Sequence, residues 1–159
     1  MRASGEETRR TIARLEAALP DNAEAVAHLA ALVERMDRYD HDRDGPVREI
    51  MARVGDRWST LILLVLRAGT FRHATLRRLV ATLSAEGGIS QRMLTLKLRA
   101  LERDGLVARE VVPTVPPQVS YSLTPLGAEL VEIVDRLLRW IEAHNDEIAA
   151  ARRGFAADE

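Results

Sequence analysis

Apolar residues recur every three or four positions along most of the chain, a spacing typical of amphipathic helices. Two such stripes precede residue 40, and they consist of Ile12, Leu15 and Leu19, then Val26, Leu29, Val33 and Met36. Pro20 separates them because proline does not continue a helix. We therefore interpret residues 1–44 as a helical arm of two helices that ends in a polar linker.

After the linker, the pattern predicts three more helices. Pro46 can open a short helix to Val54, and Asp56 can cap a second one, "RWSTLILLVLRAG", that stops at Gly69. This second helix is apolar nearly all round, so we expect it at the buried centre of the domain. The third, "FRHATLRRLVATLS", should turn inward the residues Leu76, Leu79, Val80 and Leu83.

The fourth helix after the linker, between Ser90 and Gly105, combines an apolar face with a cationic one. Ser90 is a good N-cap, and Gly105 supplies a left-handed stop. At 100° per residue, one face carries Leu94, Leu98 and Leu101. The opposite face carries Arg92, Leu96, Arg99 and Arg103, with Thr95 at its edge.

The pattern changes to β structure immediately afterwards. The segments "LVAREVV" and "QVSYSLT" are rich in β-branched residues and flank "PTVPP", which predicts a hairpin with a stiff tip. Thr124 and Pro125 then open a last helix toward Arg153, about 28 residues and about 42 Å long. Its apolar stripe is Leu126, Leu130, Ile133, Leu137, Ile141, His144 and Ile148.

This order predicts a mainly α protein with a small β-hairpin wing, that is, a winged helix-turn-helix with long dimerisation helices. We expect the DNA-binding core at residues 45–124 and a C-terminal dimerisation helix and tail at 125–159. In such a fold the fourth helix enters a DNA major groove and the hairpin lies against the adjacent backbone.

The distribution of charge along the chain also points to the segment that is predicted to contact DNA. The net charge of the 159 residues is only −1, but residues 71–112 carry eight Arg or Lys against four Asp or Glu. Residues 113–159 carry four basic against eight acidic residues. The positive charge is confined to the middle of the chain, although an uneven solvated surface would give the same tally.

Composition excludes several classes of chemistry. The chain has no cysteine, which rules out disulfides, thiolate nucleophiles, cysteine metal sites and thiol redox sensing. The longest apolar run is the six residues of "LILLVL", and the first ten residues lack a signal-peptide core, so we expect a cytoplasmic protein.

Enzymatic and metal-dependent roles find little support. The sequence contains no P-loop, GxSxG or HExxH motif, and its four histidines are scattered. The only candidate metal ligands close in sequence are Asp40, His41, Asp42 and Asp44, for which a solvated linker is the favoured interpretation. We expect no catalysis, no metal and no cofactor.

Three segments together give a specific resemblance: "GDRWSTLILLVLRAG", "ISQRMLTLKLRALERDGLVAREV" and "PTVPPQVSYSLTPLGAEL". In this order they resemble the HxlR-type family of bacterial transcriptional regulators, which is related to the MarR proteins. The resemblance covers roughly residues 46–140. It implies a homodimer that binds a pseudopalindromic operator, usually near its own gene.

The chain also departs from that family. Gly45 and Pro46 stand where the family often has a Cys-Pro pair, and in its redox- and electrophile-sensing members that thiol is the sensor. The turn before Ser90 is longer than usual, Leu96 replaces a common polar residue, and Gln118 replaces a common Arg or Lys. The arm before Pro46 is additional to the family core.

We therefore predict a DNA surface and a dimer surface. The expected DNA-binding residues are Ser90, Gln91, Arg92, Thr95, Leu96, Lys97, Arg99, Arg103, Arg109 and Gln118. The expected dimer interface consists of Leu130, Ile133, Leu137, Trp140, Ile141 and Ile148. We expect any effector to be a small apolar or aromatic molecule held at the dimer interface. The alternative is a winged-helix interaction module that dimerises but has lost specific DNA binding.

Overall fold

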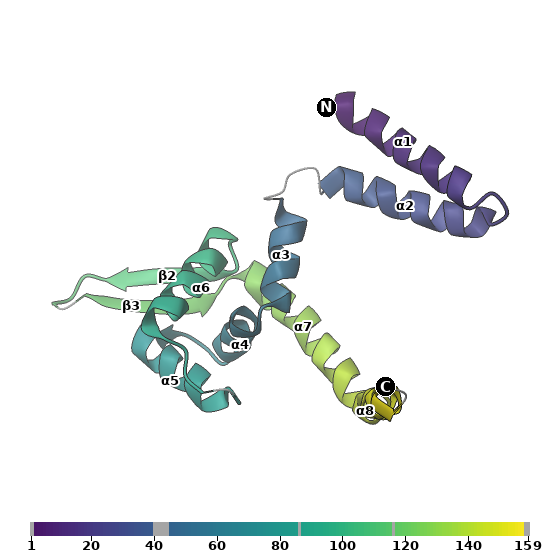
Figure 1. Cartoon of the computed structure of the whole chain (residues 1–159). Coiled ribbons are helices and arrows are strands. Elements are labelled where there is room, and N and C mark those ends of the chain that lie inside the picture. The colour runs from purple at the N-terminus through teal and green to yellow at the C-terminus, as the bar shows by residue number, and fades with distance from the viewer. Residues whose placement is uncertain (1, 40–44, 86, 116, 158–159) are drawn as a thin grey trace. The chain divides into compact units, whose positions relative to one another are not determined.

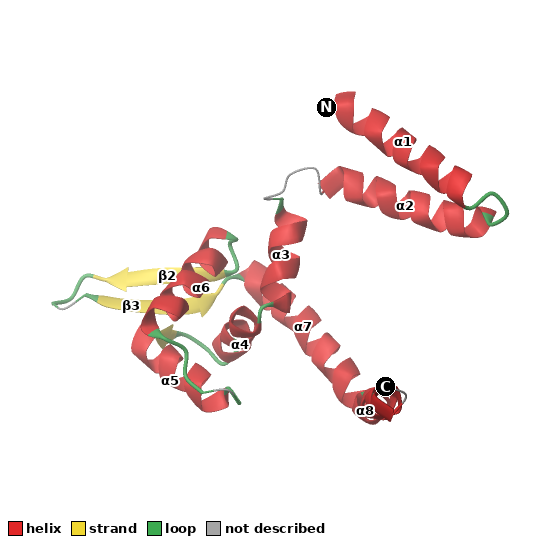
Figure 2. Ribbon diagram, viewed as in Figure 1, coloured by secondary structure: helices red, strands yellow, loops and turns green. Residues whose placement is uncertain are grey.

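A computed structural model describes residues 2–39, 45–85, 87–115 and 117–157, most of them helical (Figures 1 and 2). The chain divides into two compact units, residues 1–52 and residues 53–159. The elements are α1 (Arg2–Ala18), α2 (Ala23–Tyr39), α3 (Pro46–Gly55), α4 (Arg57–Leu66), β1 (Phe71–Arg72), α5 (His73–Leu83), α6 (Gln91–Arg103), β2 (Val107–Val112), β3 (Gln118–Leu123), α7 (Pro125–Ala143) and α8 (Asn145–Ala157).

The two arm helices, α1 and α2, pack against each other as an antiparallel pair. Asn22 begins α2 because its side-chain oxygen accepts a hydrogen bond from the amide of Ala25, at 3.0 Å. Among residues 5–38 no side chain is buried, and Leu32 and Met36 are 46% and 48% exposed. The predicted arm helices are confirmed, but on their own they enclose no core.

The second unit is organised around α4, as its all-round apolar sequence predicts. Asp56 caps α4 by accepting hydrogen bonds from the amide and hydroxyl of Ser59, at 2.8 and 2.6 Å. Its buried residues include Ile62, Leu63 and Leu66. Helices α5, α6 and α7 all contact α4. They add the buried residues Leu76, Val80, Leu94, Leu98, Leu101, Val131 and Val134.

The wing is a three-stranded antiparallel sheet in the order β1-β3-β2. In β2 and β3 the register pairs Val107 with Leu123 and Val112 with Gln118, as expected for the hairpin. The predicted helix starting at Phe71 is wrong in its first two residues, because Phe71 and Arg72 pair with Tyr121 and Ser120 of β3. Leu83, predicted to face inward, is 63% exposed at the end of α5.

The last helix is also shorter than predicted. It breaks at His144, whose ring Nδ1 lies 2.8 Å from the carbonyl oxygen of Trp140 and whose amide bonds to the same carbonyl. The backbone of His144 leaves the helical conformation, with φ of −108° and ψ of 12°, and α7 ends there. Helix α8 restarts at Asn145 with Asp146 and Glu147 in its first turn, where acidic residues are favourable. Figure 1 shows α8 turned away from the axis of α7.

Candidate nucleic-acid interface

Helix α6 has the buried and exposed faces that its sequence predicts. Ser90 caps it by accepting a hydrogen bond from the amide of Met93, at 3.1 Å, and Gly105 follows it with φ of +72°. Its inner face, Leu94, Leu98 and Leu101, is at most 1% exposed. The helix is therefore fixed by its core face, and its cationic face remains available to a ligand.

The outer face of α6 brings predicted residues together. Gln91, Arg92, Thr95, Leu96 and Arg99 line one shallow, open hollow on the surface. Leu96 is 51% exposed and therefore adds an apolar contact to an otherwise polar hollow. This mixture of cationic, polar and apolar groups suits the edges and methyl groups of bases.

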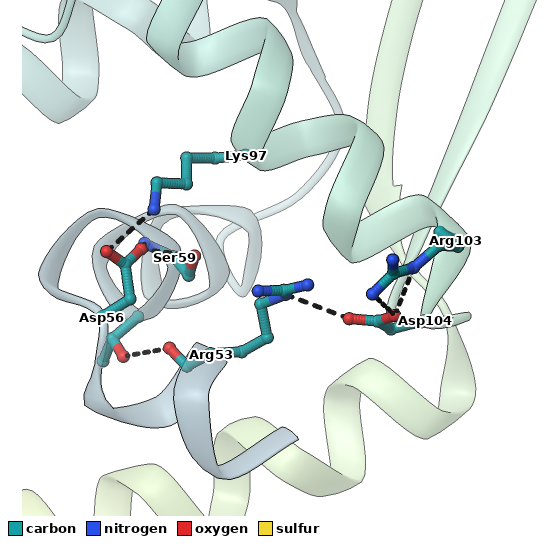
Figure 3. Close-up of polar contacts among 7 residues, drawn as sticks. Arg53, Asp56, Ser59, Lys97, Arg103 and Asp104 are labelled. Carbon is teal, nitrogen blue, oxygen red and sulfur yellow. Dashed lines mark hydrogen bonds and ion pairs between the residues drawn. The ribbon is translucent and has the colours of Figure 1, made fainter. Parts of the chain in front are cut away.

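Two ion pairs hold α6 against the corner between α3 and α4 (Figure 3). The ammonium of Lys97 lies 2.9 Å from the carboxylate of Asp56, and the guanidinium of Arg53 lies 3.0 Å from that of Asp104. Asp104 follows the end of α6, so the helix is tied at its middle and at its C-terminus. Rigid placement of this kind is what recognition of base edges requires.

Asp56 therefore serves two elements at once. Burial alone would raise the pKa of Asp56, but hydrogen bonds from Ser59 and Lys97 outweigh this effect and lower the pKa. The carboxylate stays ionised, so it caps α4 and pairs with Lys97 at the same time.

The predicted cations of α6 differ in their surroundings. Lys97 is engaged with Asp56, and its side chain is only 24% exposed. Arg103 bonds to the carboxylate of Asp104 at 3.0 Å, and its side chain is 62% exposed. Arg92 and Arg99 are exposed, and within the described parts of the chain neither side chain makes a hydrogen bond or an ion pair. These two are the cations of α6 best placed to bind an external anion.

The wing carries the remaining predicted residues. Arg109 is exposed on β2, and Gln118 is half-buried at the start of β3. The guanidinium of Arg72 donates a hydrogen bond to the side-chain oxygen of Gln118. Sequence reasoning missed Arg72 because a two-residue strand gives no periodic signal. Arg72 nevertheless supplies a cation beside Gln118.

A second residue that sequence reasoning missed lies behind Thr95. His73, the first residue of α5, places its ring Nε2 3.1 Å from the Thr95 hydroxyl oxygen. Burial and the nearby charge of Arg77 lower the pKa of His73, which keeps the ring neutral at physiological pH. A lone histidine in an amphipathic segment gives no sequence signal for such a contact.

Helix α7 has two apolar faces. Val131 and Val134 are buried against the core, at 1% and 3% exposure. A second set remains 41–54% exposed in the single chain, and it consists of Ile133, Leu137, Trp140 and Ile141. Leu130 and, on α8, Ile148 are half-buried.

Two further questions that the sequence raises are metal binding and membrane insertion. The candidate metal ligands Asp40, His41, Asp42 and Asp44 lie outside the described residues. Elsewhere in the described segments, no cluster of three or more His, Asp or Glu side chains is arranged to hold a metal. Among the described helices, none is both long enough and apolar enough to cross a membrane.

Comparison with known proteins gives consistent matches. Residues 53–149 match the family model described as HxlR-like helix-turn-helix. The HTH-type transcriptional regulator YtfH of Escherichia coli is 46% identical over 112 residues, which cover 70% of this chain and 84% of that protein. YybR of Bacillus subtilis is 35% identical over 79% of this chain and 97% of its own length.

Solved structures agree with these relatives. The transcriptional regulator YtfH from Salmonella typhimurium is 41% identical, with a TM-score of 0.58 over 70% of this chain and 95% of that one. The reduced form of HypR, described as a redox regulator, is 38% identical, with a TM-score of 0.56 over 66% and 98% of the two chains. From the winged helix, the family model and these relatives, it follows that the chain belongs to the HxlR-like helix-turn-helix family of transcriptional regulators.

Proposed function

We propose that this transcriptional regulator binds a pseudopalindromic DNA operator as a homodimer, with α6 in the major groove and the wing on the backbone. The observation that carries this proposal is the outer face of α6. Arg92 and Arg99 lack partners there among the described residues, on a helix held by a buried apolar face and two ion pairs. Arginine is the side chain that most often reads guanine, through O6 and N7.

Position along the helix assigns different roles to the cations. Arg92 lies in the first turn of α6, where recognition helices present their base-reading residues. The amides at this end, next to Ser90, also favour a phosphate. Arg103 is at the other end and already bonds to Asp104, so we assign it to the DNA backbone. Lys97 acts indirectly, by holding Asp56.

The wing contributes affinity for the DNA backbone and little sequence specificity. Its exposed cation is Arg109, and Arg72 adds a second beside Gln118. The tip is apolar, with Val115 fully exposed. Contacts to phosphate oxygens position a protein on DNA without reading bases.

Dimerisation through the exposed face of α7 supports this mode of binding. Four large apolar side chains at 41–54% exposure, close together on one helix, suit burial against a second copy. In a two-fold symmetric dimer, entry of both α6 helices into successive major grooves requires them to lie about 34 Å apart, one turn of DNA, and requires a pseudopalindromic site.

Regulation must use chemistry other than thiols. HypR is described as a redox regulator in oxidised and reduced forms, whereas this chain has no cysteine. We propose that an effector, where one acts, is a small apolar or aromatic molecule that binds at the dimer interface. A ligand there could change the separation of the two α6 helices by favouring one arrangement of the dimer.

Two substitutions test the proposal on duplex DNA that the protein retains from its own genome. Arg92→Ala should cost about 1 to 3 kcal/mol on the retained site and relax base choice at one position in each half-site. Arg103→Ala should weaken retained and scrambled duplexes alike and reduce the slope of log K against log salt by about 0.9. Arg152→Ala, an exposed cation of α8, is the matched control and should change neither quantity.

Titration of all four proteins at two salt concentrations separates the outcomes. Unchanged binding by Arg92→Ala and Arg103→Ala, in dimers that remain folded, would contradict the DNA interface. The alternative, a dimeric module that binds another protein, would then account better for the exposed Leu96.

A further inference from the structure

The contact between His73 and Thr95 joins the two helices of the helix-turn-helix. His73 opens α5, Thr95 lies in the second turn of α6, and their side chains meet at 3.1 Å. His73 is half-buried, and its ring lies 6.3 Å from that of Tyr121 on β3, tilted by 59°. The imidazole is thus held from behind while it touches a residue of the hollow on α6.

The hydrogen bonds of Thr95 leave its hydroxyl no proton for an external partner. A hydroxyl has one proton to donate and two lone pairs that can accept. The Thr95 hydroxyl donates to the carbonyl oxygen of Gln91, at 2.9 Å, and therefore accepts from the Nε2 hydrogen of His73. In the other tautomer of His73, Nε2 carries no hydrogen and can accept a hydrogen bond from the Thr95 hydroxyl. The proton is used within the protein in either case.

His73 also restricts the orientation of Thr95. Threonine in a helix divides between two side-chain rotamers, since its hydroxyl can bond a carbonyl of the preceding turn. The bond to His73 fixes the hydroxyl between α5 and the Gln91 carbonyl. The groups of Thr95 left for a ligand are one lone pair and the γ-methyl.

We propose that His73 is a positioning residue for base recognition, which makes Thr95 an acceptor and a methyl contact but never a donor to DNA. This proposal rests on the proposed function, because it assumes that α6 enters the major groove. It adds a residue outside α6 to the determinants of operator sequence.

The consequence is a defined base preference. In the major groove guanine presents only acceptors, N7 and O6, whereas adenine and cytosine present amino groups and thymine presents a methyl group. A side chain without a donor gains nothing from guanine. We therefore expect guanine to be disfavoured at the base that faces Thr95, while Arg92 selects guanine at a neighbouring position.

The test is selection of DNA by the full-length protein from a pool of duplexes with a randomised central stretch. Wild type is compared with Thr95→Val, which keeps the shape of the side chain and loses the hydroxyl, and with His73→Phe, which keeps a ring beside Tyr121. His73→Gln should restore a donor near Thr95, and His28→Gln is the matched control at an exposed histidine on α2. Sequencing the retained DNA gives the base preference at each position.

The expected result is specific to one position. Thr95→Val should identify the position in each half-site that depends on Thr95, and wild type should retain guanine there least often. Without the contact to His73, the Thr95 hydroxyl can turn away from the Gln91 carbonyl and donate to a base. His73→Phe should therefore raise the share of guanine at that position about 3- to 10-fold, the factor for one hydrogen bond. His73→Gln should restore most of the preference, and His73→Phe should have no further effect in the Thr95→Val background.

Other outcomes would overturn the proposal. The first is that wild type retains guanine as often as other bases at the Thr95-dependent position. The second is that His73→Phe retains the same share of guanine there as wild type. An effect of Thr95→Val at no position would remove Thr95 from the interface. If His73→Phe does not fold, His73→Asn, whose shorter side chain falls short of Thr95, replaces it in the same comparison. A pool in which even wild type enriches no motif would refute the proposed function together with this inference.

Discussion

A methyl group added at Gly127 should destabilise the fold severely. Gly127 lies in the first turn of α7 and is buried where the helix crosses the chain between α6 and β2. A Cβ atom there would lie 2.0 Å from the carbonyl oxygen of Leu106 and 2.9 Å from its carbonyl carbon. Cβ atoms in proteins essentially never approach a neighbour closer than 3.0 Å, so one of the two segments must move.

Neither segment can move without breaking hydrogen bonds. The Leu106 carbonyl accepts from the amide of Thr124, at 3.1 Å, and the Leu106 amide donates to Leu101, at 2.9 Å. Overpacking of a core costs about 1 to 3 kcal/mol, and an unsatisfied buried carbonyl about 1 to 3 kcal/mol more. The better helix propensity of alanine returns about 1 kcal/mol. We therefore expect Gly127→Ala to lower the free energy of unfolding by about 3 kcal/mol, the middle of a range of about 1 to 5 kcal/mol.

Thermal unfolding followed by circular dichroism measures this loss. For a chain of this size, 3 kcal/mol corresponds to a decrease in Tm of about 6 to 12 °C. The matched control is Gly154→Ala in α8, where a Cβ would meet nothing within 4 Å, and it should leave Tm unchanged or slightly raised. All proteins are compared at one concentration because association shifts Tm. A Tm for Gly127→Ala within about 2 °C of wild type would refute the reasoning, as the expected shift is several times larger.

Three further predictions concern the site and its regulation. Lys97→Met should lower the free energy of unfolding by about 1 kcal/mol, as expected for a partly exposed pair with Asp56, and should leave the salt dependence of DNA binding unchanged; a flatter salt dependence would show that Lys97 contacts phosphate. The native fold holds the pKa of His73 below its ordinary 6.5, so stability should fall as pH drops below about 6.5. In denaturant titrations, the free energy of unfolding of His73→Gln should fall less than that of wild type as the pH drops below about 6.5. The same pH dependence in both proteins would contradict this prediction. Diamide should not release operator DNA in a gel-shift assay, because the chain has no cysteine to oxidise; release reversed by dithiothreitol would contradict this.

The sequence predicted α6 correctly because several local signals agree there. Ser90, the apolar set spaced along the helix and Gly105 each specify the same start, face and end. The caps Asp56 and Thr124 were predictable for the same reason. Tertiary structure had no need to override any of these local preferences.

Long-range pairing accounts for what the sequence did not reveal. Phe71 and Arg72 form a strand only because β3 lies beside them, and two residues have no period to detect. The break at His144, whose ring lies 2.8 Å from the Trp140 carbonyl oxygen, falls in a segment whose apolar spacing continues unchanged. The sequence placed Lys97 among the expected DNA-binding residues, but it could not show the Asp56 carboxylate within 2.9 Å of the Lys97 ammonium.

The contact between His73 and Thr95 is another long-range contact that the sequence did not reveal. His73 and Thr95 are separated by 22 residues, and only the packing of α5 on α6 brings them together. Periodicity identifies which face of a helix is polar. It does not reveal which of those polar groups are already occupied within the protein.

The central claim is that α6 reads DNA as one half of a two-fold symmetric dimer. Its most direct test is to capture fragments of the organism's own genome with the full-length protein, sequence them, and map the protected bases by footprinting. The account predicts enrichment of a pseudopalindrome with half-sites about 10 bp apart, or a multiple of that, and loss of the enrichment when Arg92 and Arg99 are both replaced by alanine. Retention of fragments without a shared motif, or the same motif with the double variant, would contradict it.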